Sequence, residues 1–193
     1  MSFDTESIAS LGKLAQKLDQ AGIPWALFAG AAASVYGAER AVTDLDLLVP
    51  HEQAERLRDL LPGVELVYSE PRLTHLALPG VDLLAGMGAV DLDAPMATRI
   101  TRHEIGGVRV PVIPREDNIL LKAMWERGAE QGKHDWEDVE AMMASAPSLD
   151  WEYLRWRAGT LDQRERVEGL LARLEGLWRQ LHSEEREGTG EPD

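Results

Sequence analysis

The segment from Phe28 to Pro50, FAGAAASVYGAERAVTDLDLLVP, constrains the fold most strongly, because two acids alternate with leucines after a glycine-led run of small residues. The pattern predicts a strand, a turn at Gly30, a helix, and a second strand that opens with Asp44 and Asp46. Residues two apart in a strand share a face, so both carboxylates point one way and the leucines point into a core. Two such carboxylates repel each other unless a cation lies between them. The segment is therefore expected to supply part of a metal site.

A third acid lies in a separate apolar run. Residues 81–84 read VDLL and predict a strand that contains Asp82, and a buried strand rarely keeps a lone carboxylate unless that group is paired or metal-bound. Two-metal phosphoryl or nucleotidyl transfer uses such carboxylates to hold two magnesium ions about 3.5–4 Å apart. A glycine-led helix can offer N–H groups to phosphates. Asp91 and Asp93 form a second DxD, which is a weaker candidate for the third acid.

A simpler interpretation stays open for the first acidic pair. DLDLL can be an edge strand with one solvated acidic face, which is the commoner explanation of any single DxD. Gly30, taken alone, can be an ordinary turn glycine.

The rest of the chain predicts an α/β (α+β) fold, with a mixed sheet flanked by helices and a C-terminal helical lobe. Apolar periodicity predicts helices over 5–20, 51–61, 115–128, 133–145 and from 161 onward. Further strands are expected over 64–68 and 73–78, and a hairpin over 99–113. We expect a first domain over 1–113, a helical lobe over 114–182 and a disordered, charged tail over 183–193.

Composition limits the class of function. The 193 residues carry a formal charge of -14, which argues against a broad nucleic-acid surface but allows a small anionic substrate carried by a cation. The absence of cysteine excludes disulfides and thiolate metal sites, and the five histidines lack the spacing of a zinc site. No apolar run has the roughly 18–20 residues of a membrane helix, and the N-terminus lacks a signal-peptide pattern. We expect a soluble, cytoplasmic protein without membrane contact.

These motifs resemble the signature of the polymerase β nucleotidyltransferase superfamily: Gly, then Gly or Ser, about ten residues, Asp-x-Asp, and a later acid among apolar residues. Here Gly30 is followed by Ala31 and twelve intervening residues. The resemblance implies a nucleotidyltransferase fold with Mg²⁺ or Mn²⁺ bound at the three acidic positions, Asp44, Asp46 and Asp82. It also implies that Asp82 helps to activate an acceptor hydroxyl.

Two details refine this resemblance. Arg40 and Thr43 match the RxTxDxD form of small bacterial members. Ala31 departs from the pattern, because it lacks a hydroxyl for a phosphate contact, and Ser34, one turn on, is the expected partial substitute.

A second match lies in IPREDNILLKAMWERGAEQGKHDWEDVEAMM. It is similar to PxEDxxxxKxxxxR...KDxxDhxxL in AbiE-type nucleotidyltransferases of type IV toxin–antitoxin systems. The resemblance implies that Lys122 contacts nucleotide phosphates and that Asp135 or Asp138 orients basic groups or assists catalysis. It places Arg127 and Lys133 in the same nucleotide-binding set. Without the resemblance, the lysine and arginine would be solvated or ion-paired, and the two acids would cap a helix.

Together these features predict a magnesium-dependent nucleotidyltransferase. It would move a nucleoside monophosphate from a nucleoside triphosphate to a hydroxyl of a protein, a tRNA end or a small molecule. The AbiE-type resemblance implies a toxin–antitoxin setting and a cognate toxin or antitoxin protein as partner. The alternative is a catalytically weak or inactive module of the same fold that binds a protein partner, which Ala31 favours and the three acids oppose. A metal-dependent phosphoryl hydrolase is the third candidate.

Overall fold

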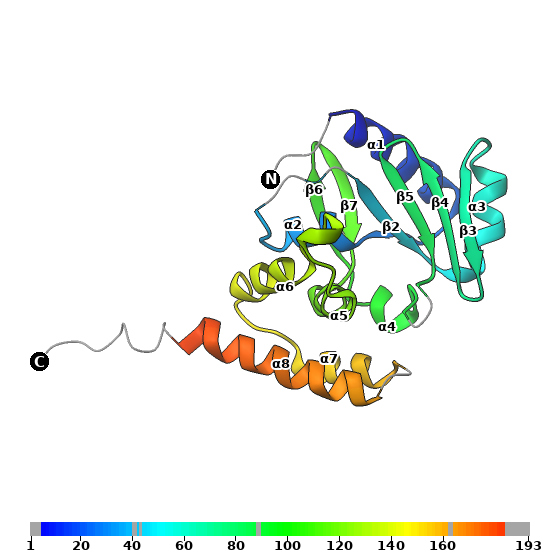
Figure 1. Ribbon diagram of the computed structural model, residues 1–193. Coiled ribbons are helices and arrows are strands. Elements are labelled where there is room, and N and C mark those ends of the chain that lie inside the picture. The colour runs from blue at the N-terminus through cyan, green and yellow to red at the C-terminus, as the bar shows by residue number, and fades with distance from the viewer. Residues whose placement is uncertain (1–4, 40–41, 43, 88–89, 162–163, 184–193) are drawn as a thin grey trace, which may run out of the picture.

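The structure is a computed structural model that describes residues 5–39, 42, 44–87, 90–161 and 164–183 (Figure 1). Within these ranges one seven-stranded sheet has the order β3-β4-β5-β2-β1-β7-β6. The strands are β1 (Ala26–Leu27), β2 (Leu45–Val49), β3 (Glu65–Glu70), β4 (Leu73–Leu78), β5 (Val81–Ala85), β6 (Thr101–Ile105) and β7 (Val108–Val112). The pairs β2–β5 and β1–β7 are parallel and the others are antiparallel. This mixed sheet confirms the predicted fold class.

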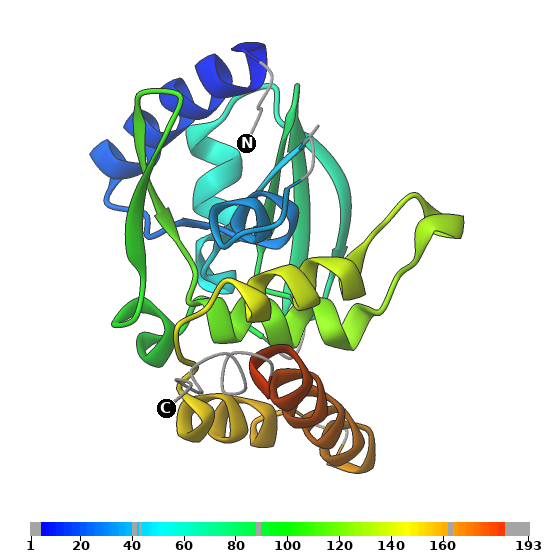
Figure 2. The same ribbon diagram turned by 90° about the vertical axis from the view of Figure 1, so that its left-hand side faces the viewer.

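Helices cover the sheet and extend beyond it. They are α1 (Thr5–Ala21), α2 (Ala29–Val35), α3 (Ala54–Leu60), α4 (Ala94–Ala97), α5 (Arg115–Trp125), α6 (Asp135–Ala144), α7 (Trp151–Gly159) and α8 (Arg164–Ser183), with short 3₁₀ turns η1 (His51–Gln53) and η2 (Ala129–Gln131). Helices α5 and α6 lie below the sheet, and α7 and α8 form a further layer beneath them (Figures 1 and 2). Among the described helices, none combines the length and apolarity that crossing a bilayer requires.

The hydrophobic core is continuous through these layers. One cluster of buried residues runs from Leu11 in α1 through the sheet to Leu174 in α8. It crosses the position between residues 113 and 114 at which the sequence predicts a domain boundary. The division into two domains therefore stays a prediction, and Ser183 is the last residue of α8 rather than the first of a tail. The rest of the predicted tail, 184–193, lies outside the described residues.

Strand β2 lies in the middle of the sheet, between β5 and β1. The interpretation of DLDLL as an edge strand is therefore wrong. Leu45 and Leu47 are almost fully buried, as the alternation predicts, while Asp46 between them is only partly exposed. A central strand with one apolar face fixes its register, because a slip of one residue would turn the acids into the core.

A buried ionic group anchors α7 to α5 and to the start of α4. Arg157 Nε lies 2.8 Å from Asp117 Oδ1 in α5, and Arg157 Nη1 lies 2.7 Å from Asp93 Oδ2 at the start of α4. The Tyr153 hydroxyl donates to Asp117 Oδ2 at 2.6 Å. Asp93 thus forms a structural ion pair with Arg157, and Asp91 accepts a hydrogen bond from the His51 N–H. Neither acid takes the third position in the site.

The turn before α2 falls one residue earlier than predicted. Gly30 lies inside α2, and Ala29 is the residue with positive φ, +53°. A buried amide holds it there: the Ala29 N–H donates to Asn118 Oδ1 at 2.8 Å, and Asn118 Nδ2 donates to the Ala29 carbonyl at 3.1 Å. A left-handed conformation costs an L-residue roughly 1–2 kcal/mol, so this clamp from α5 fixes the start of α2.

We expect Ala29→Gly to leave the free energy of unfolding within about 0.5 kcal/mol of wild type, or to raise it. Relief of the left-handed backbone offsets the lost methyl contact and the added freedom of the unfolded chain. The matched control Ala32→Gly, in the right-handed interior of the same buried helix, should lower it by about 1 kcal/mol or more. Urea denaturation measures both, and equal losses in the two variants would contradict the assignment of strain to Ala29.

Candidate functional site

The parallel pairing of β2 with β5 brings two predicted acids together. Asp46 lies directly opposite Asp82 in the register, and Leu47 lies opposite Leu83. Both leucines are fully buried on the core side, while both acids are partly exposed on the other side. Residues far apart in the sequence therefore present two carboxylates side by side on one face of the sheet.

This arrangement is electrostatically unfavourable without a counter-charge. Burial, followed by the neighbouring charge of Asp82, raises the pKa of Asp46 to about 6, although Lys133 and Lys122 act in the opposite direction. A carboxylate with so high a pKa is stabilised by a proton or by a cation. The pair therefore has the chemistry of a cation site.

Asp44, the third predicted acid of this strand pair, precedes β2 and is exposed. Burial, the charge of Asp82 and the charge of Asp44 all raise the pKa of Asp46, and the effect of Asp44 is the smallest of the three. Within the described residues, no group of three or more His, Cys, Asp or Glu side chains is arranged to hold a metal ion. The pair alone still fits Mg²⁺, which commonly takes one or two protein carboxylates and completes its shell with water and substrate phosphates.

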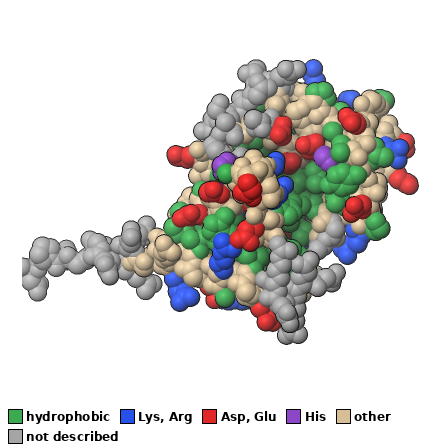
Figure 3. Space-filling model, viewed as in Figure 1, with side chains coloured by type: hydrophobic (Ala, Val, Ile, Leu, Met, Phe, Trp, Pro, Cys, Tyr) green, Lys and Arg blue, Asp and Glu red, His purple; other side chains and the backbone are tan. Residues whose placement is uncertain are grey.

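The pair opens into a cavity of about 350 Å³. Figure 3 shows a hollow with hydrophobic walls and with acidic, basic and histidine side chains at its rim. The lining comprises Phe28, Ala29, Asp46, Tyr68, Leu73, His75, Asp82, Leu84, Met87, Trp125, Arg127 and Lys133. Aromatic and apolar walls with a few convergent charges are typical of ligand sites. A larger hollow of about 570 Å³, against α3 and β3, contains neither acid of the pair.

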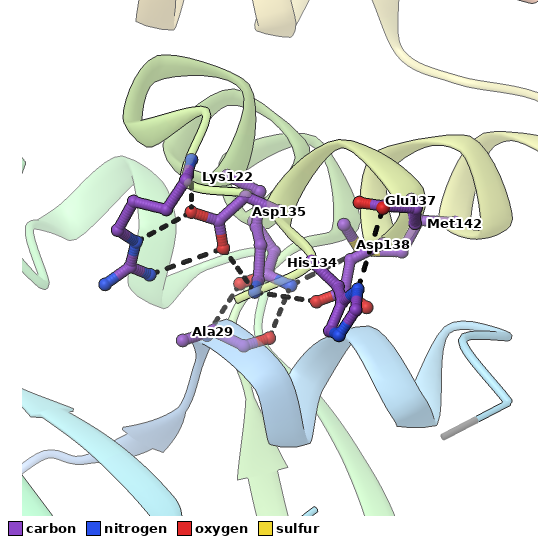
Figure 4. Close-up of polar contacts among 9 residues, drawn as sticks. Ala29, Lys122, His134, Asp135, Glu137, Asp138 and Met142 are labelled. Atoms are coloured by element: carbon purple, nitrogen blue, oxygen red, sulfur yellow. Dashed lines mark hydrogen bonds and ion pairs between the residues drawn. The ribbon is translucent and has the colours of Figure 1, made fainter. Parts of the chain in front are cut away.

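Lys122 occupies a different environment from the one the resemblance implies. Its Nζ lies 2.8 Å from Asp135 Oδ1 and 2.7 Å from Asp138 Oδ2, and all three side chains are 2% exposed or less. Figure 4 shows this group between α5 and α6, next to Ala29 at the start of α2. Two carboxylates already neutralise the lysine inside the fold. The structure therefore gives Lys122 a role in packing, and its contact with nucleotide phosphates stays a prediction.

Asp135 orients a second cation. Its Oδ2 accepts a hydrogen bond from Arg127 Nε at 2.7 Å, and the Arg127 guanidinium lies 4.4 Å from the ring centroid of Trp125. Although burial alone would raise it, the hydrogen bonds from Arg127 and Lys122 hold the pKa of Asp135 below its ordinary value. Arg127 and Lys133 line the cavity, so they are the described basic side chains placed to meet a phosphate there.

The predicted phosphate-binding residues of α2 are not among the residues that line the cavity. Gly30, Ala31 and Ser34 are all buried, and the residue of α2 that lines the cavity is Ala29. Ser34 Oγ has no hydrogen-bond partner among the described residues. The predicted site residues Arg40 and Thr43 lie outside the described residues.

Two residues that the sequence analysis does not select belong to the site or support it. His75 Nε2 lies 2.8 Å from Asp82 Oδ1, and Asn118 clamps Ala29. The signal for His75 was a lone histidine that shares a strand face with the apolar Leu73 and Ala77 in LTHLAL, one hairpin before VDLL. The signal for Asn118 was a polar residue at a position that faces inward in a predicted helix.

Neither a protein-family model nor a curated protein sequence matches this chain. Among solved structures, it is similar to the antibiotic-resistance factor ANT(2'')-Ia, with a TM-score of 0.55 and 17% identity over 95% of this chain and 99% of that one. It is also similar to the lincosamide antibiotic adenylyltransferase LnuA, with a TM-score of 0.51 and 13% identity over 76% and 100% of the two chains.

A third similar structure is TM1012 of Thermotoga maritima, whose assignment as a nucleotidyltransferase is itself a proposal. The TM-score is 0.52 and the identity 15%, over 67% of this chain and 90% of that one. At such identities a likeness establishes architecture, and function has to be argued from the site. The narrower resemblance to AbiE-type proteins stays a prediction. The chain has a nucleotidyltransferase fold.

Proposed function

We propose that this protein is a magnesium-dependent nucleotidyltransferase, which moves a nucleoside monophosphate from a nucleoside triphosphate to an acceptor hydroxyl. The observation that carries the proposal is the pair Asp46 and Asp82, held side by side in a cavity of a nucleotidyltransferase fold. An acid whose pKa is raised by burial and by a second acid is a good candidate for a functional group.

The residues have distinct roles in this proposal. Asp46 and Asp82, with Asp44 beside them, would hold Mg²⁺ or Mn²⁺, which supplies charge neutralisation for the triphosphate. The acceptor oxygen bonds to the α-phosphorus as the bond from that phosphorus to the bridging oxygen breaks, and pyrophosphate leaves. Asp82 accepts the hydroxyl proton. Arg127 and Lys133 face the phosphates.

A small-molecule acceptor agrees best with the charge of -14 on the chain, because a tRNA end needs a basic surface. LnuA is described with bound lincomycin and ANT(2'')-Ia with adenylyl-2''-tobramycin, and both of these ligands are small molecules. A protein acceptor and a toxin–antitoxin setting rest on the motif resemblance alone.

The first test is transfer of label from each α-labelled nucleoside triphosphate with Mg²⁺, in the presence of small hydroxylated acceptors, tRNA and cell extract. Asp46→Asn and Asp82→Asn should each reduce transfer at least about 100-fold, since even an outer-shell partner of a metal can cost that much. Asp59→Asn, at an exposed acid of α3, is the matched control and should leave transfer unchanged. Undiminished transfer by Asp46→Asn would contradict the assignment, and release of phosphate or pyrophosphate without an acceptor would favour a hydrolase.

Stability should respond to Asp46 in the opposite direction from activity. The folded-state pKa of Asp46 is raised to about 6, above the ordinary 3.8, so metal-free protein should lose stability as pH rises from about 4 to about 6. At pH 7.5 without metal, Asp46→Asn should therefore raise the free energy of unfolding by on the order of 1 kcal/mol. Addition of Mg²⁺ should stabilise the wild type and leave the variant unchanged. Chemical denaturation at several pH values measures this, and a destabilised Asp46→Asn protein would refute the repulsion argument.

Two lysines provide a matched comparison of packing and phosphate contact. Lys122→Met removes the lysine from two buried carboxylates, of which Asp135 keeps Arg127 as a partner, and should lower the free energy of unfolding by about 3–5 kcal/mol. Lys133→Met, at an exposed lysine of the cavity rim, should leave stability within about 0.5 kcal/mol and weaken nucleoside triphosphate binding. Denaturation and calorimetric titration give both quantities. A stable Lys122→Met protein with weak nucleotide binding would restore the phosphate role of Lys122.

A further inference from the structure

We propose that His75 is a positioning residue that holds the Asp82 carboxylate in the orientation in which the acid pair can bind a divalent cation. The inference rests on the proposed function and extends it to a histidine outside the acidic motif.

Strand register places His75 next to Asp82. In the antiparallel pair β4–β5, Ala77 lies opposite Asp82 and His75 lies opposite Leu84. His75 is therefore the diagonal neighbour of Asp82 on the same face of the sheet, within reach of a long side chain. Its Nε2 lies 2.8 Å from Asp82 Oδ1, and the side chains of the histidine and the acid are 19% and 33% exposed.

The contact counters a specific electrostatic problem. Asp82 lies opposite Asp46 on the neighbouring strand, and two adjacent like charges favour side-chain rotamers that point apart. A hydrogen bond to Oδ1 fixes the carboxylate of Asp82 and leaves its Oδ2 to bind a cation or an acceptor hydroxyl. Ligating carboxylates in metal sites are held in this way by outer-shell partners.

The histidine ring is itself held in place. Tyr68 of β3 lies opposite His75 in the register, and the two rings meet edge to face with centroids 5.3 Å apart. Tyr68, His75 and Asp82 all line the cavity. One row of side chains across three strands thus supports the orientation of the acid.

Manganese binding tests the inference without any need for the acceptor. We would titrate Mn²⁺ into the full chain and follow free Mn²⁺ by electron paramagnetic resonance. His75→Leu should weaken Mn²⁺ binding about 10–100-fold. His75→Gln should bind within about 3-fold of wild type, because its amide N–H reaches the position of Nε2. His75→Asn should lose affinity as His75→Leu does, because its amide falls short.

The controls separate positioning from packing. His103→Leu removes a histidine of β6 that bonds to Thr101 away from the cavity, and it should leave Mn²⁺ binding unchanged. A merely structural histidine would make the Asn and Gln variants alike, which would overturn the inference. Loss of binding in Asp46→Asn together with wild-type binding in His75→Leu would also overturn it and leave the proposed function standing. No Mn²⁺ binding by the wild type would overturn both.

Discussion

The parallel pairing of β2 with β5 sets two negative charges side by side, and the fold keeps them there. On the opposite face of these strands, Leu47 and Leu83 are fully buried, so the register cannot slip without exposing core residues. The paired backbone keeps Asp46 and Asp82 adjacent, and burial, followed by the charge of Asp82, raises the pKa of Asp46 to about 6. A cation between the two carboxylates would relieve their repulsion. This constraint links the stability of the sheet to the chemistry proposed for the cavity.

Helix α5 holds three other helices in place through three buried polar residues, each of which reaches a different element. Asp117 pairs with Arg157 of α7, Asn118 clamps Ala29 at the start of α2, and Lys122 is neutralised by two acids of α6. Buried polar groups specify geometry more strictly than apolar contacts do, because each unsatisfied group is costly. The layers of helices beneath the sheet therefore fix the cavity wall that α2 and α5 provide. Arg127, just beyond α5, completes that wall from the same helix pair.

The sequence predicts those parts of the fold that depend on local pattern. Alternation identifies β2 and β5, and the isolated acid in VDLL points to Asp82 before any register is known. The remainder depends on tertiary contacts that periodicity does not encode. The left-handed backbone falls on Ala29 because Asn118 holds it, although Gly30 is the residue better suited to a turn. The burial of Lys122 depends on two acids from the next helix. The ion pairs of the buried Arg157 that anchor α7 depend on acids from α5 and from the start of α4, and the place of His75 beside Asp82 depends on the register of β4 against β5.

In the proposed function, Asp46 and Asp82 jointly ligate the divalent cation that accompanies the nucleotide. A crystal structure with Mn²⁺ and a nucleoside triphosphate analogue that has a methylene group between the α- and β-phosphorus atoms tests it most directly. We expect an anomalous manganese peak within about 2.0–2.3 Å of an oxygen of each carboxylate, with phosphate oxygens completing the shell. A manganese peak that lacks either carboxylate as a ligand, or a nucleotide bound outside the cavity, would contradict it.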